Sequence, residues 1–153
     1  MSELDSTDLR LLRLLQDDGR LTNAELAERA NVSPATCHRR LHRLFEQGYV
    51  RSVRALIDPQ KVGLGAIALV GVVLDRSTPE SFASFEAAIR VLPMVLDCHL
   101  VAGDFDYLLK IRVRDMQDFN ILHGERLIAL PGVRQTRTFF VMKEVKDGEP
   151  LDF

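Results

Sequence analysis

Along the first third of the chain, apolar residues recur every three or four positions, which is the spacing of one face of an α-helix. The pattern predicts three helices, over about 5–16, 22–30 and 33–47. Thr22 and Glu25 have the spacing of a capping box, and Ser33-Pro34 supplies an N-cap hydroxyl followed by a proline in the first helical turn. Two short capped helices joined by a tight turn are typical of a helix-turn-helix.

From Leu64 onwards the spacing of apolar residues changes, and strands alternate with helices. The pattern predicts strands over 64–74, 94–100, 107–113 and 133–145, with helices over 78–92 and 115–130. The order β-α-β-β-α-β is the ferredoxin-like arrangement, an antiparallel sheet with both helices on one face. The predicted class is therefore α+β, with a (winged) helix-turn-helix domain at 1–50, an extended linker at 51–63 and a ferredoxin-like domain at 64–153.

The first predicted strand of the second domain is apolar on both faces. Its two alternating sets are Ala66, Ala68, Val70 and Val72, and Ile67, Leu69 and Val73. A solitary two-layer domain should show water a more polar outer face, so we expect a second copy of the sheet to cover it. The resulting twofold homodimer would carry two helix-turn-helix domains. We expect Val70 or Val72 to lie against the partner.

The third predicted helix carries a cationic face opposite its apolar one. Residues 34–63 hold six basic and two acidic side chains, although the whole chain has a formal net charge of -2. Such a helix can pack on a core and contact double-stranded DNA, which is the predicted partner. The predicted DNA-binding residues are those near the helix start, which approach base edges, and the arginines, which contact phosphate: Ser33, Ala35, Thr36, His38, Arg39, Arg40 and Arg43. The alternative is that these arginines are only a solvated face.

Other features of the sequence exclude several classes of protein. No apolar run reaches the roughly 18 residues of a membrane-spanning helix, and the polar start of the chain is unlike a secretion signal, so a cytoplasmic protein is predicted. Cys37 and Cys98 lack disulfide or zinc spacing and are predicted structural thiols, with a redox role for Cys37 as the alternative. His99 and His123 stand alone, so no metal site and no cofactor is predicted. Without a hydrolase motif or phosphate loop, an enzyme is not expected.

Several short motifs follow one another along the chain in an order that is typical of one protein family. Ala55-Leu-Ile-Asp-Pro59 and Val62-Gly-Leu64 end the linker, Gly103-Asp-Phe-Asp-Tyr107 joins the middle strands, and Leu130-Pro-Gly-Val133 precedes the last strand. With the helix-turn-helix before them, these motifs give a chain that resembles the Lrp/AsnC transcription regulators over nearly its full length. The resemblance implies a bacterial or archaeal regulator that dimerises through its C-terminal domain, often builds octamers and senses an amino acid or related metabolite.

The resemblance also places the effector beside the loop between the middle strands. An acidic turn can accept an α-amino group, and backbone amides freed by the turn can hold a carboxylate. The predicted effector-binding residues are Gly103, Asp104, Asp106, Thr136 and Thr138. Two alternatives remain at this stage: the loop is only a hairpin turn with threonines chosen for strand formation, or the protein is an architectural one that bends or wraps DNA without a ligand.

Overall fold

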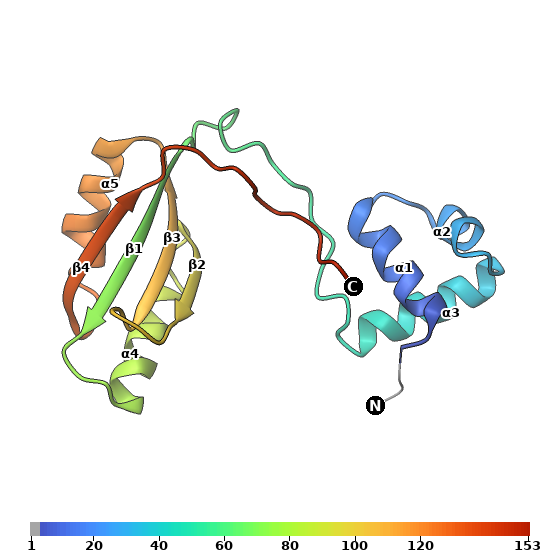
Figure 1. Cartoon of the computed structure of the whole chain (residues 1–153), viewed down its shortest axis with the longest axis horizontal. Helices are drawn as coiled ribbons and strands as arrows, with labels where there is room; N and C mark the ends of the chain where they lie inside the picture. The colour runs from blue at the N-terminus through green and yellow to red at the C-terminus, as the bar shows by residue number, and fades with distance from the viewer. Residues whose placement is uncertain (1–3) are drawn as a thin grey trace. The chain divides into compact units, whose positions relative to one another are not determined.

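The computed structural model describes residues 4–153, which form two compact units joined by an extended segment (Figure 1). One unit, here called the helical unit, contains residues 4–57 together with 146–153; the other, the sheet unit, spans Asp58–Val145. The tail joins the helical unit because Gln16 Nε2 donates to the carbonyl of Leu151 at 2.8 Å and Leu151 N donates to Gln16 Oε1 at 3.0 Å. The domain predicted at 64–153 includes this tail, so the structure differs from the prediction here. Residues 1–3 of the predicted first domain lie outside the described residues.

Three helices make up the helical unit, and local side-chain caps begin each of them. They are α1 (Ser6–Asp17), α2 (Asn23–Ala30) and α3 (Pro34–Glu46). Asp5 and Thr22 form capping boxes at α1 and α2, and Ser33 caps α3. Asn31 takes a left-handed conformation, φ 58°, and turns the chain sharply from α2 towards α3. The predicted helix-turn-helix is therefore confirmed.

Small and medium apolar side chains form the core of the helical unit. The buried residues are Leu11, Leu26, Ala27, Ala30, Cys37 and Leu44. The alanines let α2 approach its neighbours closely, and all three helices contribute to this single core. Among residues 4–57 the structure contains no strand, so the segment after α3 is extended chain without a paired β-wing.

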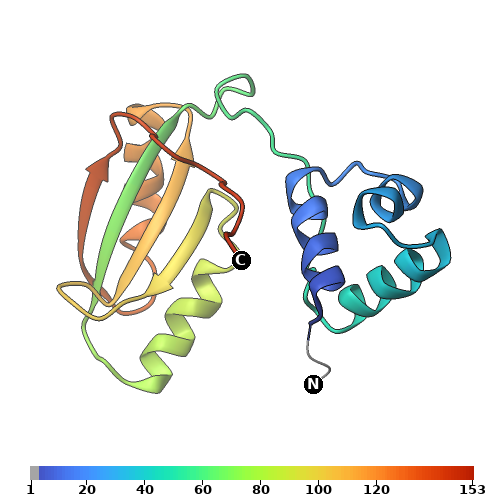
Figure 2. The ribbon, with the colours of Figure 1, turned by 45° about the vertical axis from the view of Figure 1, so that its right-hand side comes forward.

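The sheet unit has the predicted β-α-β-β-α-β order, with one additional π-helical turn. Its elements are β1 (Ala66–Leu74), α4 (Pro79–Ile89), β2 (Val95–Leu100), β3 (Tyr107–Val113), α5 (Met116–Leu122), the π-helix η1 (His123–Leu127) and β4 (Val133–Phe140). The strands pair antiparallel in the order β2-β3-β1-β4, as Figure 2 shows. Residues of α4 and α5 pack with those of β1 and β3 in one core, which confirms the ferredoxin-like fold.

The last strand ends at Phe140, about five residues earlier than predicted. Val141 N makes one more bond, to the carbonyl of Ile67 at 3.0 Å, before the chain leaves the ladder. Glu144 then pairs with Arg112 and Lys110 of β3, which lies beyond β1 in the sheet. Glu144 thus takes part in a long-range contact just after the strand ends, and the local sequence pattern does not contain this contact.

The two faces of β1 have opposite roles to those expected. Val70 and Val72 are fully buried with Phe85 in the core under the helices, so the expectation that they lie against a partner is wrong. The outer face carries the other set, including Leu69 and Val73, which are only half-buried. Strand residues alternate between faces, and when both sets are apolar, periodicity alone cannot tell which set the helices cover.

Candidate functional site

The start of α3 is anchored on α2 and presents polar atoms outward. Ser33 Oγ accepts from the backbone N–H of Thr36 at 3.2 Å and donates to Thr36 Oγ1 at 2.9 Å. Asn23 Nδ2, from α2, donates to the carbonyl of Pro34 at 3.0 Å. Of the residues predicted to bind DNA, four are exposed and Thr36 is half-buried; the exposed ones are Ser33, Ala35, His38 and Arg39.

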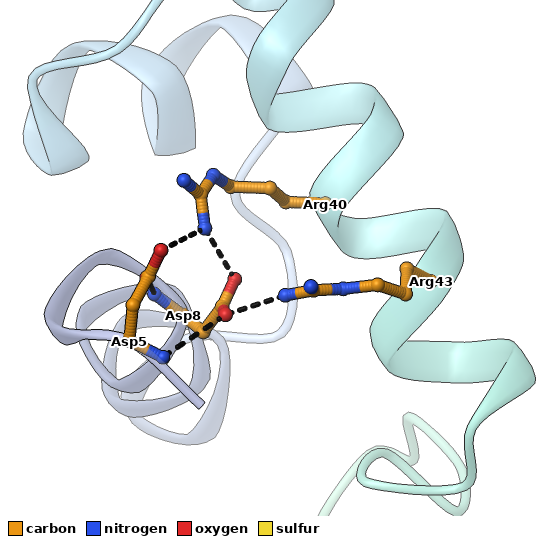
Figure 3. Close-up of polar contacts among 4 residues, drawn as sticks. All are labelled: Asp5, Asp8, Arg40 and Arg43. Atoms are coloured by element: carbon orange, nitrogen blue, oxygen red, sulfur yellow. Dashed lines mark hydrogen bonds and ion pairs between the residues drawn. The ribbon is translucent and has the colours of Figure 1, made fainter. Parts of the chain in front are cut away.

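Arg40 and Arg43 turn instead towards α1, where they meet two carboxylates (Figure 3). Arg40 Nη1 lies 2.7 Å from Asp5 Oδ2 and 2.8 Å from Asp8 Oδ1. Arg43 Nη2 bonds the other carboxylate oxygen of Asp8. The side chain of Asp8 is only 1% exposed, so α3 holds a buried negative charge of α1 with two guanidinium groups.

The ion pairs shift the acidity of these groups. Burial raises the pKa of Asp8, but the hydrogen bonds from Arg40 and Arg43 outweigh it, and the net pKa lies below the ordinary value of 3.8. The backbone bond from Asp8 and the side-chain bond from Arg40 lower the pKa of Asp5. Asp5 and Asp8 therefore stay ionised at neutral pH, and the four charges compensate one another.

This cluster gives intramolecular partners to two of the three arginines predicted to contact phosphate. Arg40 and Arg43 connect α3 to α1, so we correct the expectation that they belong with Arg39 on one outward cationic face. A signal for the correction was present in the sequence: Asp5 and Asp8 are three residues apart, as are Arg40 and Arg43. Residues at this spacing share one helix face, so the two acids can meet the two bases.

In the sheet unit, the loop from β2 to β3 contains the predicted acidic turn. Gly103 has φ 153°, and Asp104 beside it is exposed. Asp106 is held in place at the end of β1: its Oδ2 accepts from Leu74 N at 2.8 Å, and its own N–H donates to the carbonyl of Val72 at 2.9 Å. Asp106 therefore has a structural role in the turn, whereas the carboxylate of Asp104 is open to solvent.

The two predicted threonines lie elsewhere in the sheet. Thr136 and Thr138 are on β4, opposite the core residues Val72 and Val70 of β1, and thus on the helix-covered face. Thr136 Oγ1 is 2.9 Å from His123 Nε2, which begins the π-helix after α5. Sequence reasoning missed this pairing, because the extra residue of a π-turn changes which side chains reach the strand. Since β1 separates β4 from β3, the structure does not bring the threonines together with the acidic loop.

Several other expectations can be compared with the described residues. Cys37 is fully buried, and burial raises the pKa of its thiol, which favours a structural thiol over a redox one. Within residues 4–153, no three His, Cys, Asp or Glu side chains are grouped so as to hold a metal ion. None of the helices in that range is long and apolar enough to cross a membrane.

Comparison with known protein families assigns both units. Residues 4–51 match the model of a winged helix-turn-helix DNA-binding domain, and residues 67–151 match the Lrp/AsnC ligand binding domain. The chain belongs to the Lrp/AsnC family. It is thus a ligand-responsive, DNA-binding regulator of transcription, with α3 as the second helix of its helix-turn-helix.

Individual Lrp/AsnC members are similar along almost the entire chain. The leucine-responsive regulatory proteins of Escherichia coli and Salmonella typhimurium are each 44% identical over 149 residues, covering 97% of this chain and 91% of theirs. A transcriptional regulator of Neisseria meningitidis, crystallised as an L-Met complex, superposes with a TM-score of 0.92 at 39% identity, covering 98% and 97% of the two chains. The leucine response regulatory protein of Mycobacterium tuberculosis gives 0.84 at 30% identity, covering 97% and 99%.

Proposed function

We propose that the protein is a cytoplasmic homodimer that controls genes of amino-acid metabolism, and that a bound amino acid changes its affinity for DNA. The family assignment supports the proposal, as do similar proteins that are named leucine-responsive or were crystallised with L-Met. Exposure of the start of α3 is the observation that carries the DNA-binding part. An amino acid with an apolar side chain is the expected effector.

In the proposed DNA complex, α3 enters the major groove with its N-terminal turns leading. Ala35, Thr36 and His38 approach base edges, with Ser33 at the rim, because these residues begin the helix and point away from the core. Arg39 contacts phosphate. Arg40 and Arg43 act indirectly, since their pairing with Asp8 fixes the orientation of α3 on α1.

Salt dependence of DNA binding tests these roles. Replacing Arg39 with alanine should flatten the slope of log K against log salt by about 1, the amount expected for one lost phosphate contact, without lowering thermal stability. Arg90→Ala is the matched control, because Arg90 is an exposed arginine at the C-cap of α4 in the other unit. Thr36→Ala should instead change the preferred base at one operator position. An unchanged slope for Arg39→Ala would remove this arginine from the phosphate contacts.

For the effector, we propose that Asp104 accepts the α-amino group and that the free amides near Gly103 hold the carboxylate. The exposure of Asp104 and the open space beside Gly103, where an added Cβ would meet no atom within 4 Å, support this role. Thr136 and Thr138, on the helix-covered face of β4, supply hydroxyl groups from a second copy of the chain. A ligand that contacts both sets is therefore held between two copies of the chain, which links effector binding to the association of dimers.

Calorimetry with L-leucine and L-methionine tests the effector site. Asp104→Asn should weaken the binding of either amino acid at least tenfold, because an ion pair with the α-amino group is lost. Glu80→Gln, at an exposed carboxylate in the first turn of α4, is the matched control and should bind normally. Wild-type affinity in Asp104→Asn would place the effector elsewhere and leave the loop a simple turn.

We propose that a second copy of the chain packs on the outer face of the sheet. Leu69 and Val73 of β1 lie on this face with Phe139 of β4, which is 52% exposed. The helices α4 and α5 cover the opposite face of the sheet, so they leave this one uncovered. Two copies of such an apolar face can pack against each other about a twofold axis. Leu69→Glu in the full chain should give monomers in sedimentation, whereas Val91→Glu, at an exposed position just after α4, should not. A dimeric Leu69→Glu variant would exclude this face as the interface.

A further inference from the structure

The centre of the outer sheet face is covered by a side chain from the acidic loop. Gly71 of β1 is buried although it belongs to the outward set, because the ring of Phe105 lies on it. A Cβ atom added to Gly71 would be 2.5 Å from Phe105 Cδ1 and Cε1 and 2.6 Å from Cγ. No side-chain carbon fits at that distance, so the ring can sit there only because residue 71 is glycine.

Phe105 also reaches the far edge strand. Its ring centroid is 6.5 Å from that of Phe139 on β4, with the planes at 74°, an edge-to-face contact. Phe139 pairs with Leu69 across the β1–β4 ladder. The loop between β2 and β3 therefore places an aromatic ring on the outer face of β1. This ring lies next to Phe139, one of the residues proposed to contact a second copy.

The backbone is held on one side of Phe105, at Asp106, and is exposed on the other, at Asp104. Asp106, which follows it, bonds Val72 and Leu74 at the end of β1, and its carbonyl accepts from Val101 N at 2.9 Å. Asp104, which precedes it, is the exposed carboxylate of the loop. With Asp106 held, a displacement of Asp104 has to be taken up at Phe105, and the ring sits in a close-packed contact that has little room for partial movement.

We propose that Phe105 is a positioning residue that couples the effector loop to the outer sheet face: an amino acid bound at Asp104 shifts the Phe105 ring on Gly71 and so changes how a second copy packs. The inference rests on the proposed function, since it takes its effector site and its dimer face from there. It adds a defined contact, that of the Phe105 ring with Gly71, through which ligand binding at the loop changes the packing at the dimer interface.

The test separates ligand affinity from coupling. In the wild-type protein, L-leucine or L-methionine should change the dimer dissociation constant or the DNA affinity by a factor of about 5 to 150, the usual range of allosteric coupling. Phe105→Ala keeps Asp104 and Asp106, so amino-acid affinity should stay within about threefold while that factor falls to about 1. Phe105→Leu, which keeps an apolar side chain, guards against a folding defect in the alanine variant.

A double-mutant cycle on the close contact gives an independent readout. Gly71→Ala expels the wild-type ring onto the interface and should weaken the dimer at least tenfold. In a Phe105→Ala background there is no ring to expel, so the same Gly71→Ala change should have little effect, and the two substitutions should be strongly non-additive. Additive effects in this cycle would contradict the seating of the ring on Gly71.

The outcomes distinguish the inference from the proposed function. Normal amino-acid affinity in Asp104→Asn would overturn the effector site, and with it the premise of the coupling. Loss of affinity in Asp104→Asn together with full coupling in folded Phe105→Ala and Phe105→Leu would leave the site intact and overturn the role of Phe105. Loss of coupling at retained affinity in both Phe105 variants supports it.

Discussion

Each unit of the protein contains one buried charged residue among those described, and the two are held in different ways. Asp8, 1% exposed, belongs to the helical unit and is bonded by Arg40 and Arg43 of α3. Arg112, 7% exposed, belongs to the sheet unit and is bonded by Glu144 at 2.7 Å. A buried charge is tolerated only when it is partnered, and both residues meet this condition.

The partners lie in different parts of the two architectures. Those of Asp8 come from the helix proposed to enter the major groove, so the cluster sets how α3 sits on α1. Arg112 Nη1 also points at the carbonyl of Leu64, at 3.4 Å, so this residue contacts the chain just before β1 and, through Glu144, just after β4. The first buried charge therefore orients a functional element, whereas the second fastens the segments that enter and leave the sheet.

Removal of the acid from the helical cluster should have the largest effect. Asp8→Ala removes the buried carboxylate that both guanidinium groups bond and leaves Arg40 with Asp5 alone. We expect a loss of about 3 kcal/mol in the free energy of unfolding, at the lower end for a broken buried pair because both arginines are partly exposed. Thermal denaturation of the full chain measures it. Asp5→Ala, at a carboxylate that is 52% exposed, should cost clearly less. Equal losses for the two variants would mean that burial of Asp8 has no special weight.

The corresponding change in the sheet unit should have a smaller effect. Glu144→Gln keeps the shape of the side chain but removes the charge that Arg112 and Lys110 share, and Glu144 itself is 27% exposed. We expect a loss of about 1 kcal/mol. Chemical denaturation followed by near-ultraviolet circular dichroism, to which Tyr107 in the core of the sheet unit contributes, is a suitable measurement. Glu125→Gln, on the exposed side of η1, serves as the control. A loss as large as that of Asp8→Ala would abolish the distinction between the two clusters.

Acid should weaken both clusters, with no effect near neutral pH. The hydrogen bond from Arg112 is the main cause that lowers the pKa of Glu144 below its ordinary value of 4.5, and the net pKa of Asp8 is lowered as well. A carboxyl group whose folded pKa is depressed contributes stability above its unfolded pKa, and this stability is lost as pH falls through the folded value. Unfolding free energy should therefore be level above about pH 5 and decline below about pH 4. Asp8→Asn should flatten part of that decline; an unchanged acid profile would contradict the linkage.

Prediction from sequence succeeded where the information is local. The caps formed by Thr22 with Glu25, and by Ser33 before Pro34, involve residues that are adjacent or three apart. Such caps predict the start of a helix independently of the rest of the chain. The same holds for the alternation of apolar and polar residues that located β2 and β3. The candidate site was predicted only in part. Arg39 is exposed whereas Arg40 is half-buried, and this difference depends on where α1 packs.

The sequence by itself determined the elements, their order, the family and the segments that carry the candidate sites. Only the tertiary structure decided which arginines of α3 turn inward to Asp8, which face of β1 the helices cover and which ring lies on Gly71. The physical reason is sequence separation. Caps and periodicity act over a few residues, whereas the partners of Asp8 and Gly71 are about thirty or more positions away, and only the packing of whole helices and strands brings such groups together.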